Sequence, residues 1–265
     1  EIFILFLSIF WFVLWVVFGI RKNKKIKIKD DFNLNWYGHR GLLNRAPENT
    51  WLGFQAALDA GFRSIEMDVL QTKDGKIVCT HNFDLERETD GKGYIDCKTL
   101  SELETINAGA KWPNIKATIP TLESALVRLP KGCQVNIEIK TRKLMDWSTP
   151  REVIKIIKKL KIQNDVIISS FNPIALRIVK CIESSFETGL LFKDARAVGL
   201  ISFARANYIH PRSDIVTDDL IKYAQRYKLG INVWTVNSRV GMQFFMEKQV
   251  KGIITDYPEA IPSGI

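Results

Sequence analysis

The chain has 265 residues, of which 46% are hydrophobic and 25% are charged, a balance typical of a globular protein with a sizeable core. This composition excludes disordered, collagen-like and disulfide-stapled chains, and none of the four cysteines forms a CxxC pair. The net charge of +9 is uneven: residues 21–29 hold six basic residues and no acid, whereas residues 30–265 hold 32 basic and 28 acidic residues. This distribution argues against nucleic-acid binding and favours contact with a membrane surface that carries anionic lipid.

Residues 1–20 are predicted to form a transmembrane helix. The run from residue 2 to residue 20 is apolar apart from one serine and one glycine, and as a helix it would span about 28 Å, close to the hydrocarbon thickness of a bilayer. A signal peptide is the alternative, but its basic residues usually precede the apolar run, whereas here they follow it in a juxtamembrane linker, residues 21–34. The positive-inside rule then predicts a single-pass membrane protein with a cytoplasmic catalytic domain. Basic residues ahead of Glu1 would reverse this orientation.

Residues 35–265 are predicted to form one domain in which short strands alternate with amphipathic helices. The helix-like segments include residues 49–61, 150–162, 172–184 and 218–230. Nine β-branched runs are typical of strands, and they cover residues 36–39, 64–70, 76–81, 134–140, 165–171, 188–192, 207–211, 231–237 and 252–256. This alternation indicates an α/β fold with a parallel sheet, either open or closed into a barrel.

One of the nine runs does not require a crossover. Runs 64–70 and 76–81 are separated by only five residues, QTKDG, in which the Asp-Gly pair is a strong hairpin signal. A two-residue turn would pair residues whose numbers sum to 147, which sets Glu66 opposite His81. The second run is then a β-hairpin arm on strand two. Eight parallel strands remain, as a (β/α)8 or TIM barrel requires.

Residues 82–120 interrupt the alternation. They are rich in glycine, aspartate, lysine and threonine, and only residues 100–107 have a helical pattern. Long loops of such barrels gather at the carboxyl ends of the strands, so this segment is predicted to be an inserted loop region on the catalytic face.

Carboxylates stand on two strands that are otherwise apolar. In the run SIEMDVL, Glu66 and Asp68 share one face of the strand. In the run QVNIEIK, Glu138 and Lys140 do the same. Burying a carboxylate costs on the order of several kcal/mol unless it is paired or bound to a metal. Three carboxylates at one barrel mouth would form a site for one hard divalent cation, Mg²⁺ or Ca²⁺, and buried salt bridges are the alternative.

Two of the three histidines also stand at strand ends. His39 ends the first run, in YGHRG, and His81 ends the hairpin arm. Two imidazoles beside a metal can supply a general base and a general acid for phosphodiester cleavage. A single histidine at a strand end is more often structural, so the hypothesis depends on the combination with the carboxylates.

A series of short motifs runs through the chain from residue 39 to residue 258. They are HRG (39–41), APENT (46–50), EMDV (66–69), TKDG (72–75), HNFDLERETDG (81–91), PTLESAL (120–126), NIEIK (136–140), SSF (169–171), VWTVN (233–237) and GIITDYP (252–258). In this order they resemble the glycerophosphodiester phosphodiesterase (GDPD) family of the PLC-like phosphodiesterases, and the resemblance spans about residues 36–260.

The resemblance implies a (β/α)8 barrel that hydrolyses glycerophosphodiesters to sn-glycerol 3-phosphate and an alcohol with the help of a divalent metal. Carried over by motif, the implied roles are metal binding by Glu66, Asp68 and Glu138, acid–base catalysis by His39 and His81, and substrate or phosphate binding by Arg40, Lys140 and Trp234. Arg40 would hold a phosphate oxygen, and Lys140 would add positive charge where the transition state becomes more negative.

Other matched residues have architectural interpretations. Asn49 is expected to cap the helix that follows the APENT motif, with a site contact as the alternative. Asp256 ends the last strand and is expected to cap or orient a neighbour, outside the catalytic set. The chain departs from the family pattern at Asn82, where aspartate is usual after the second histidine.

Two other functions remain open at this stage. The predicted membrane helix favours a lysophospholipase D, which would release lysophosphatidic acid from lysophospholipids. A non-catalytic membrane module that binds phospholipid headgroups is the second alternative. The expected partners are therefore a small glycerophosphodiester or a lysophospholipid and a phospholipid membrane, and no nucleic acid.

Overall fold

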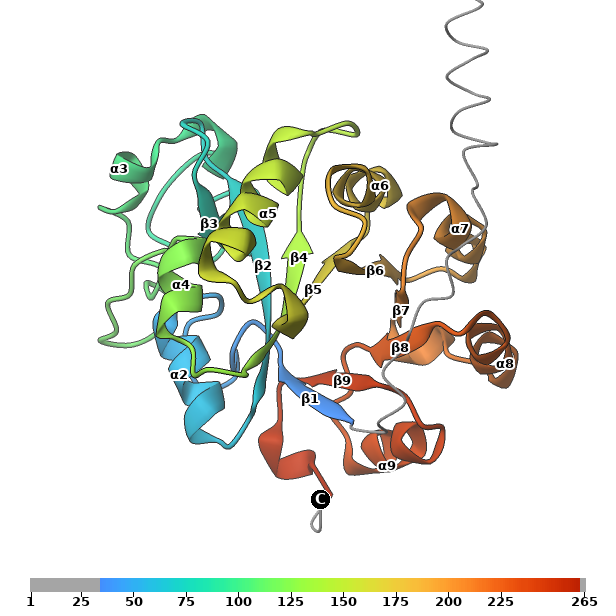
Figure 1. Cartoon of the computed structure of the whole chain (residues 1–265). Helices are drawn as coiled ribbons and strands as arrows, with labels where there is room; N and C mark the ends of the chain where they lie inside the picture. Colours follow the sequence, from blue (N-terminus) through green and yellow to red (C-terminus); the bar gives the residue numbers. More distant parts are fainter. Residues whose placement is uncertain (1–33, 263–265) are drawn as a thin grey trace, which may run out of the picture.

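The computed structural model describes residues 34–262, which form a closed barrel of eight parallel strands surrounded by helices (Figure 1). The parallel strands are β1 (Asn35–Gly38), β2 (Ser64–Gln71), β4 (Gln134–Ile139), β5 (Val166–Ser170), β6 (Glu187–Phe192), β7 (Tyr208–Pro211), β8 (Gly230–Val233) and β9 (Gly252–Thr255). Strand β1 pairs with both β2 and β9, and this double pairing closes the barrel. The predicted TIM barrel is confirmed.

Helices cover the outer face of the strands. They are α2 (Trp51–Asp59), α4 (Leu122–Arg128), α5 (Ser148–Leu160), α6 (Pro173–Ile182), α7 (Ile201–Ala204), α8 (Asp218–Tyr227) and α9 (Arg239–Glu247). Helix α5 shows why they pack: Val153, Ile154 and Ile157 form its buried face, while the lysines between them face solvent. Several helices begin with a threonine whose hydroxyl accepts a backbone N–H, as Thr50 does for α2 and Thr217 for α8.

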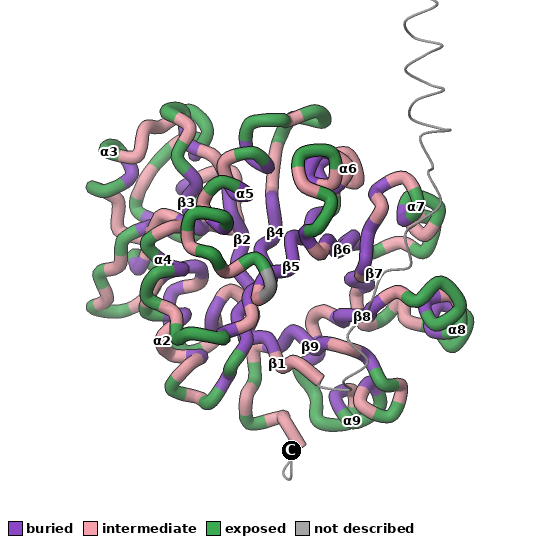
Figure 2. The backbone as a smooth tube through the Cα atoms, viewed as in Figure 1, coloured by how far each residue is buried: buried purple, intermediate pink, exposed green. Residues whose placement is uncertain are grey.

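Alternate residues of the strands face opposite environments. On β2, Ile65, Met67 and Val69 join the apolar core between strands and helices, so Glu66 and Asp68 point into the barrel. Figure 2 shows the strands as a buried inner ring and the helices as exposed on their outer sides. A carboxylate on such a strand is therefore surrounded by protein rather than by solvent.

The hairpin has a different register from the predicted one. Strand β3 (Ile77–Cys79) pairs antiparallel with β2, and Cys79 faces Val69, so paired residue numbers sum to 148 rather than 147. The cause is Gly75, whose φ of 81° is left-handed and which adds one residue to the turn as a β-bulge. His81 is consequently not opposite Glu66, and the last backbone contact of this arm runs from the N–H of Thr80 to the carbonyl of Asp68.

Residues 82–120 are packed against the hairpin. This segment contains a 3₁₀ turn (Ile95–Cys97) and the short helix α3 (Leu100–Leu103). Its buried residues Leu85, Ile95 and Leu103 form a small core of their own with Leu70 and Val78 of the hairpin. The segment is thus tied to the strand that carries Glu66 and Asp68.

The predicted transmembrane helix, residues 1–20, and all of the linker except Leu34 lie outside the described residues. Across residues 34–262, no helix combines the length and the hydropathy needed to cross a bilayer.

Candidate active site

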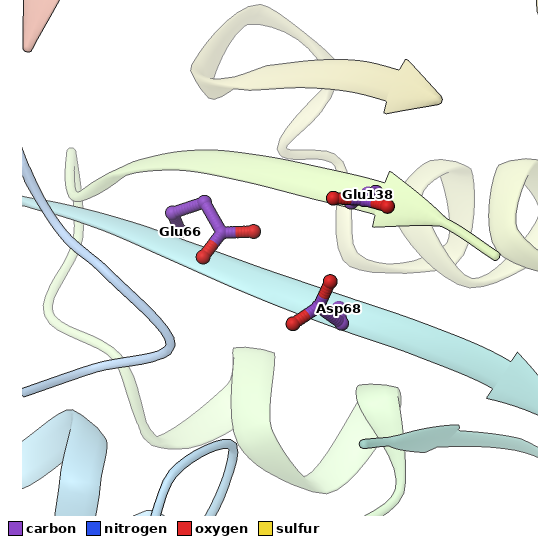
Figure 3. Close-up of side chains that lie close together, drawn as sticks. All are labelled: Glu66, Asp68 and Glu138. Atoms are coloured by element: carbon purple, nitrogen blue, oxygen red, sulfur yellow. The ribbon is translucent and has the colours of Figure 1, made fainter. Parts of the chain in front are cut away.

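Three carboxylates meet at the carboxyl ends of β2 and β4. Asp68 and Glu138 are direct neighbours in the parallel register of these strands. Glu66 lies two residues before Asp68, on the same face of β2. All three side chains are buried, and one oxygen of each lies within 4.8 Å of one oxygen of the other two. Figure 3 shows the carboxylate groups directed toward one another. The predicted cluster is therefore present, and three oxygen donors at this spacing fit a hard divalent cation.

The positive side chains around the cluster leave part of its charge uncompensated. Lys140 lies 3.5 Å from an oxygen of Asp68 and 3.6 Å from an oxygen of Glu138. Arg40 Nε lies 3.3 Å from the other oxygen of Asp68. These two cations face three carboxylates, and Arg40 also pairs with Glu48. The remaining negative charge is costly to bury, and a bound cation would offset it.

Arg40 is fixed by the segment that follows it. Its guanidinium group donates from Nη1 to both oxygens of Glu48, at 3.0 and 2.8 Å, and its backbone N–H donates to Glu66 Oε2 at 2.9 Å. Burial alone would lower the pKa of Arg40, but Asp68 and Glu48 raise it, so the group stays charged. The sequence prediction did not give Glu48 a role, yet this residue aims Arg40 at the site.

Asn49 is not the helix cap that the sequence suggested. Thr50 caps α2, and Asn49 adopts a left-handed conformation with φ of 54°. This conformation directs its side chain to β2, where Nδ2 donates to Asp68 Oδ2 at 3.0 Å and Oδ1 accepts the Asp68 N–H at 2.9 Å. Asn49 therefore orients one of the predicted metal ligands, which was the alternative interpretation of this residue.

His39 is held by the last strand of the barrel. Its Nδ1 lies 2.7 Å from Asp256 Oδ1, and Asn237 Nδ2 donates to the second oxygen of Asp256 at 2.6 Å. Because a carboxylate only accepts hydrogen bonds, this contact places a proton on Nδ1 and leaves Nε2 of His39 to exchange a proton with a substrate. Asp256 therefore orients His39, as one of its two predicted roles required.

His81 has a different environment. Its Nδ1 is 3.1 Å from the side-chain oxygen of Asn82, a neutral group. Burial lowers the pKa of His81 to about 4, against the opposing effect of the Asp68 charge. The imidazole is therefore neutral at neutral pH and able to accept a proton.

Trp234 directly follows β8 at the barrel mouth, and a hydrogen bond to β7 holds its side chain. Its indole N–H donates to the carbonyl of His210 at 2.7 Å, and its ring meets Phe171 edge to face at a centroid distance of 5.5 Å. His210 itself is fully buried, and burial lowers its pKa to about 3. His210 is thus a residue of the barrel interior, while a contact of the Trp234 ring with a substrate stays a prediction.

The carboxylates influence one another's ionisation. Burial raises the pKa of Glu66 well above its ordinary value, and the charge of Asp68 adds to this effect. Burial and Asp68 also raise the pKa of Glu138 to about 8. For Asp68, burial acts in the same direction, but Lys140 and Arg40 outweigh it and lower the pKa to about 2. The site alone therefore favours protons on Glu66 and Glu138, and a cation bound there would displace them.

These shifts predict that the chelator-treated protein loses stability as pH rises from about 6.5 to about 8. Below this window the lowered pKa values of His81 and His210 act in the opposite direction, because the unfolded state binds protons on these two side chains that the folded state does not. The folded-state pKa of Glu138 is raised from 4.5 to about 8, so its contribution is complete below the unfolded value and is lost as pH rises through the folded value. Asp68 has the opposite sign, but its contribution is lost only as pH falls toward about 2. Thermal unfolding should show a falling Tm over this range, and added Mg²⁺ or Ca²⁺ should raise Tm more at the upper end.

The control for this prediction is Glu138→Gln, which mimics the protonated carboxyl group and should flatten the pH dependence. A Tm that rises with pH between about 6.5 and about 8 in the absence of divalent cations would contradict the assigned shifts.

Comparison with known proteins assigns the chain to a family. Residues 39–260 match the Glycerophosphoryl diester phosphodiesterase family. The chain is also 34% identical over 232 residues to a glycerophosphodiester phosphodiesterase of Caldanaerobacter subterraneus subsp. tengcongensis, which covers 84% of this chain and 94% of that protein. The chain belongs to the glycerophosphoryl diester phosphodiesterase family. It is accordingly an enzyme, a glycerophosphodiester phosphodiesterase.

Solved structures of this family have the same fold. The glycerophosphodiester phosphodiesterase of Agrobacterium tumefaciens superposes with a TM-score of 0.76 at 25% identity, covering 86% of this chain and 98% of that chain. An Oleispira antarctica phosphodiesterase in complex with the product sn-glycerol-3-phosphate superposes with a TM-score of 0.78 at 24% identity, covering 86% and 94%. Residues 34–262 thus correspond to nearly the whole of these proteins.

The contact between His39 and Asp256 gives a prediction for this phosphodiesterase. Asp256→Asn should lower kcat roughly 10- to 100-fold, because the amide leaves the His39 ring less well oriented. The affinity for a divalent cation should not change, since Asp256 is not part of the carboxylate cluster. Steady-state kinetics and calorimetric cation titration would measure the two effects. Glu259→Gln, at an exposed carboxylate paired only with Arg45 among the described contacts, is the matched control.

Proposed function

We propose that the chain hydrolyses glycerophosphodiesters to sn-glycerol 3-phosphate and an alcohol, with one divalent cation, Mg²⁺ or Ca²⁺, held by Glu66, Asp68 and Glu138. The buried three-carboxylate cluster beside Arg40 and Lys140 carries this proposal, because it can hold a cation and a phosphate side by side. The product complex of the Oleispira antarctica phosphodiesterase supports the same chemistry in a protein of this fold.

The positive side chains would bind the phosphodiester. The cation, when bound, would supply Lewis-acid stabilisation of the phosphate charge. Arg40, aimed by Glu48, would donate to a phosphate oxygen, and Lys140 would move from the carboxylates toward the charge that builds up at phosphorus. Both side chains are mostly buried, which strengthens their electrostatic effect.

The two histidines would move protons on either side of phosphorus. His81 is neutral, so it would take a proton from the attacking water molecule, whose oxygen forms the new bond to phosphorus. His39 is oriented by Asp256 through Nδ1, so its Nε2 would give a proton to the alcohol oxygen as the old phosphorus–oxygen bond breaks. The assignment of acid and base is part of the proposal.

A substrate panel tests the function and its alternative together. A lysophospholipase D activity is favoured by apolar side chains at the mouth, where Phe171 and Trp234 could contact an acyl chain. Glycerophosphocholine and lysophosphatidylcholine should be compared with Mg²⁺ and with Ca²⁺. Faster turnover of glycerophosphocholine supports the first proposal, and faster turnover of lysophosphatidylcholine supports the second. Negligible turnover of both would overturn both proposals.

We also propose that residues 1–20 anchor the enzyme in a membrane with the barrel on the cytoplasmic side. The support is the apolar run and the six basic residues that follow it, both of which precede the family match at residue 39. Protease treatment of intact cells and of inverted vesicles would test the orientation, because only inverted vesicles should expose the barrel to digestion.

A further inference from the structure

The loop between β4 and α5 presents an unusual set of apolar side chains to solvent. Leu144 is 72% exposed, Met145 is 56% exposed and Trp147 is 44% exposed. A single exposed apolar residue is ordinary, but three within four positions form a patch that calls for a function. The loop extends beyond the carboxyl end of β4 (Figure 1), and Figure 2 shows it as exposed.

Hydrogen bonds hold this loop in place. The carboxylate of Asp146 accepts the N–H of Ser148 at 2.9 Å and the hydroxyl of Thr149 at 2.6 Å. On the other side, Asn172 donates from Nδ2 to the carbonyl of Leu144 at 2.9 Å. The structure therefore specifies the conformation that directs the apolar side chains outward.

The patch continues to the barrel mouth. Asn172 follows Phe171, whose ring is 43% exposed and contacts Trp234. The same loop begins at Lys140, which contacts the carboxylate cluster. The hydrogen bond from Asn172 to Leu144 thus places the loop beside the segment that carries Phe171.

The charge around the patch is positive. Lys143 and Arg151 are exposed on the loop and on the first turn of α5. Arg142 of the same loop pairs with Asp96 at 3.2 Å, and Asp146 is engaged by the helix start. A second copy of this face would bring like charges together, which argues against self-association through it. Apolar tips flanked by basic side chains match a bilayer surface, where tryptophan lies at the headgroup level and basic groups attract anionic lipid.

We propose that Leu144, Met145, Trp147 and Phe171, with Lys143 and Arg151, form a docking surface for an anionic lipid bilayer. Docking through this surface turns the barrel mouth toward the bilayer. The inference concerns binding and does not depend on which phosphodiester the enzyme cleaves.

Vesicle binding tests the proposal. The protein used is residues 34–265, without the N-terminal apolar run. This part of the chain matches nearly the full length of its relatives. Binding is measured by co-sedimentation with vesicles of phosphatidylcholine alone and of phosphatidylcholine with phosphatidylglycerol in equal parts. Leu144→Ser/Met145→Ser should lower the partition coefficient for the mixed vesicles roughly tenfold. Lys143→Ser/Arg151→Ser should lower binding to the mixed vesicles, and this binding should weaken with salt.

The control is Val127→Ser/Tyr227→Ser. These side chains are 63% and 55% exposed at the carboxyl ends of α4 and α8, at the opposite end of the barrel, so their replacement should leave vesicle binding unchanged. Hydrolysis of soluble glycerophosphocholine by Leu144→Ser/Met145→Ser should equal that of the parent chain. If the parent chain hydrolyses no glycerophosphodiester, the vesicle assay still decides this proposal, with circular dichroism as the check on folding.

Three results would contradict the proposal that this surface docks on a bilayer. The first is equal vesicle binding by the parent chain and Leu144→Ser/Met145→Ser. The second is equal binding to both vesicle types. The third is self-association of the parent chain in light scattering without vesicles, abolished by the loop variant.

Discussion

Replacing Glu66 with alanine should strongly weaken the binding of Mg²⁺ and Ca²⁺ and lower kcat for glycerophosphodiester hydrolysis by about a thousandfold or more. The reason is the geometry of the cluster, in which each of the three carboxylates offers one oxygen to a common point. Removing one of three ligands leaves a weaker site and removes a negative charge that offsets the cation. Calorimetric titration gives the loss of affinity, and steady-state kinetics at saturating cation gives the loss of rate.

A matched variant separates the charge of Glu66 from its packing. Glu66→Gln keeps the volume of the side chain and one oxygen, which can still accept the Arg40 N–H, but it removes the charge. Cation affinity should fall in this variant as well, while Tm in the absence of cations should stay equal or rise, because the neutral amide replaces a carboxyl group that burial already favours in its neutral form. Full activity in both Glu66 variants would show that Glu66 is not a metal ligand.

Loss of either histidine is the second large effect. His39→Ala and His81→Ala should each lower kcat by about 10²- to 10⁴-fold, the usual contribution of a positioned acid or base. Cation affinity should change little, because the carboxylate cluster remains intact.

A glycerophosphodiester whose leaving group is p-nitrophenol distinguishes the roles of the two histidines. Nitrophenolate leaves without a proton, so this substrate should restore much of the rate of His39→Ala and little of the rate of His81→Ala. The reverse pattern would exchange the acid and the base. Unchanged kcat in both variants with the natural leaving group would exclude these histidines from catalysis.

The barrel and the carboxylate cluster were accessible from the sequence because each follows from a local pattern. Alternation on β2 puts Glu66 and Asp68 on one face, and the short QTKDG connection identifies the antiparallel arm. The register of that arm was predicted incorrectly, because a left-handed Gly75 lengthens the turn by one residue, and sequence alone does not distinguish this turn from the shorter one.

Contacts between distant segments do not follow from any local pattern in the sequence. Asp256 was left outside the catalytic set, although it is the partner of His39, because no periodicity links two residues 217 positions apart. Asn49 was interpreted as a helix cap, since asparagine is common there, but its left-handed backbone turns it to Asp68 instead. The contact of Asp256 depends on the closure of the barrel, and the contact of Asn49 depends on a single backbone angle.

The pairing of the first and last strands has a consequence for biosynthesis. Both histidines and all three carboxylates belong to the first 138 residues, but the carboxylate that orients His39 is translated after β9. A chain released early from the ribosome, or one clipped ahead of residue 252, would keep every one of those five groups and still lack both the strand that pairs with β1 and the partner of His39. Full activity therefore requires that translation has passed β9 and Asp256. A nascent chain cannot hydrolyse phosphodiesters at the full rate before its last strand has been added.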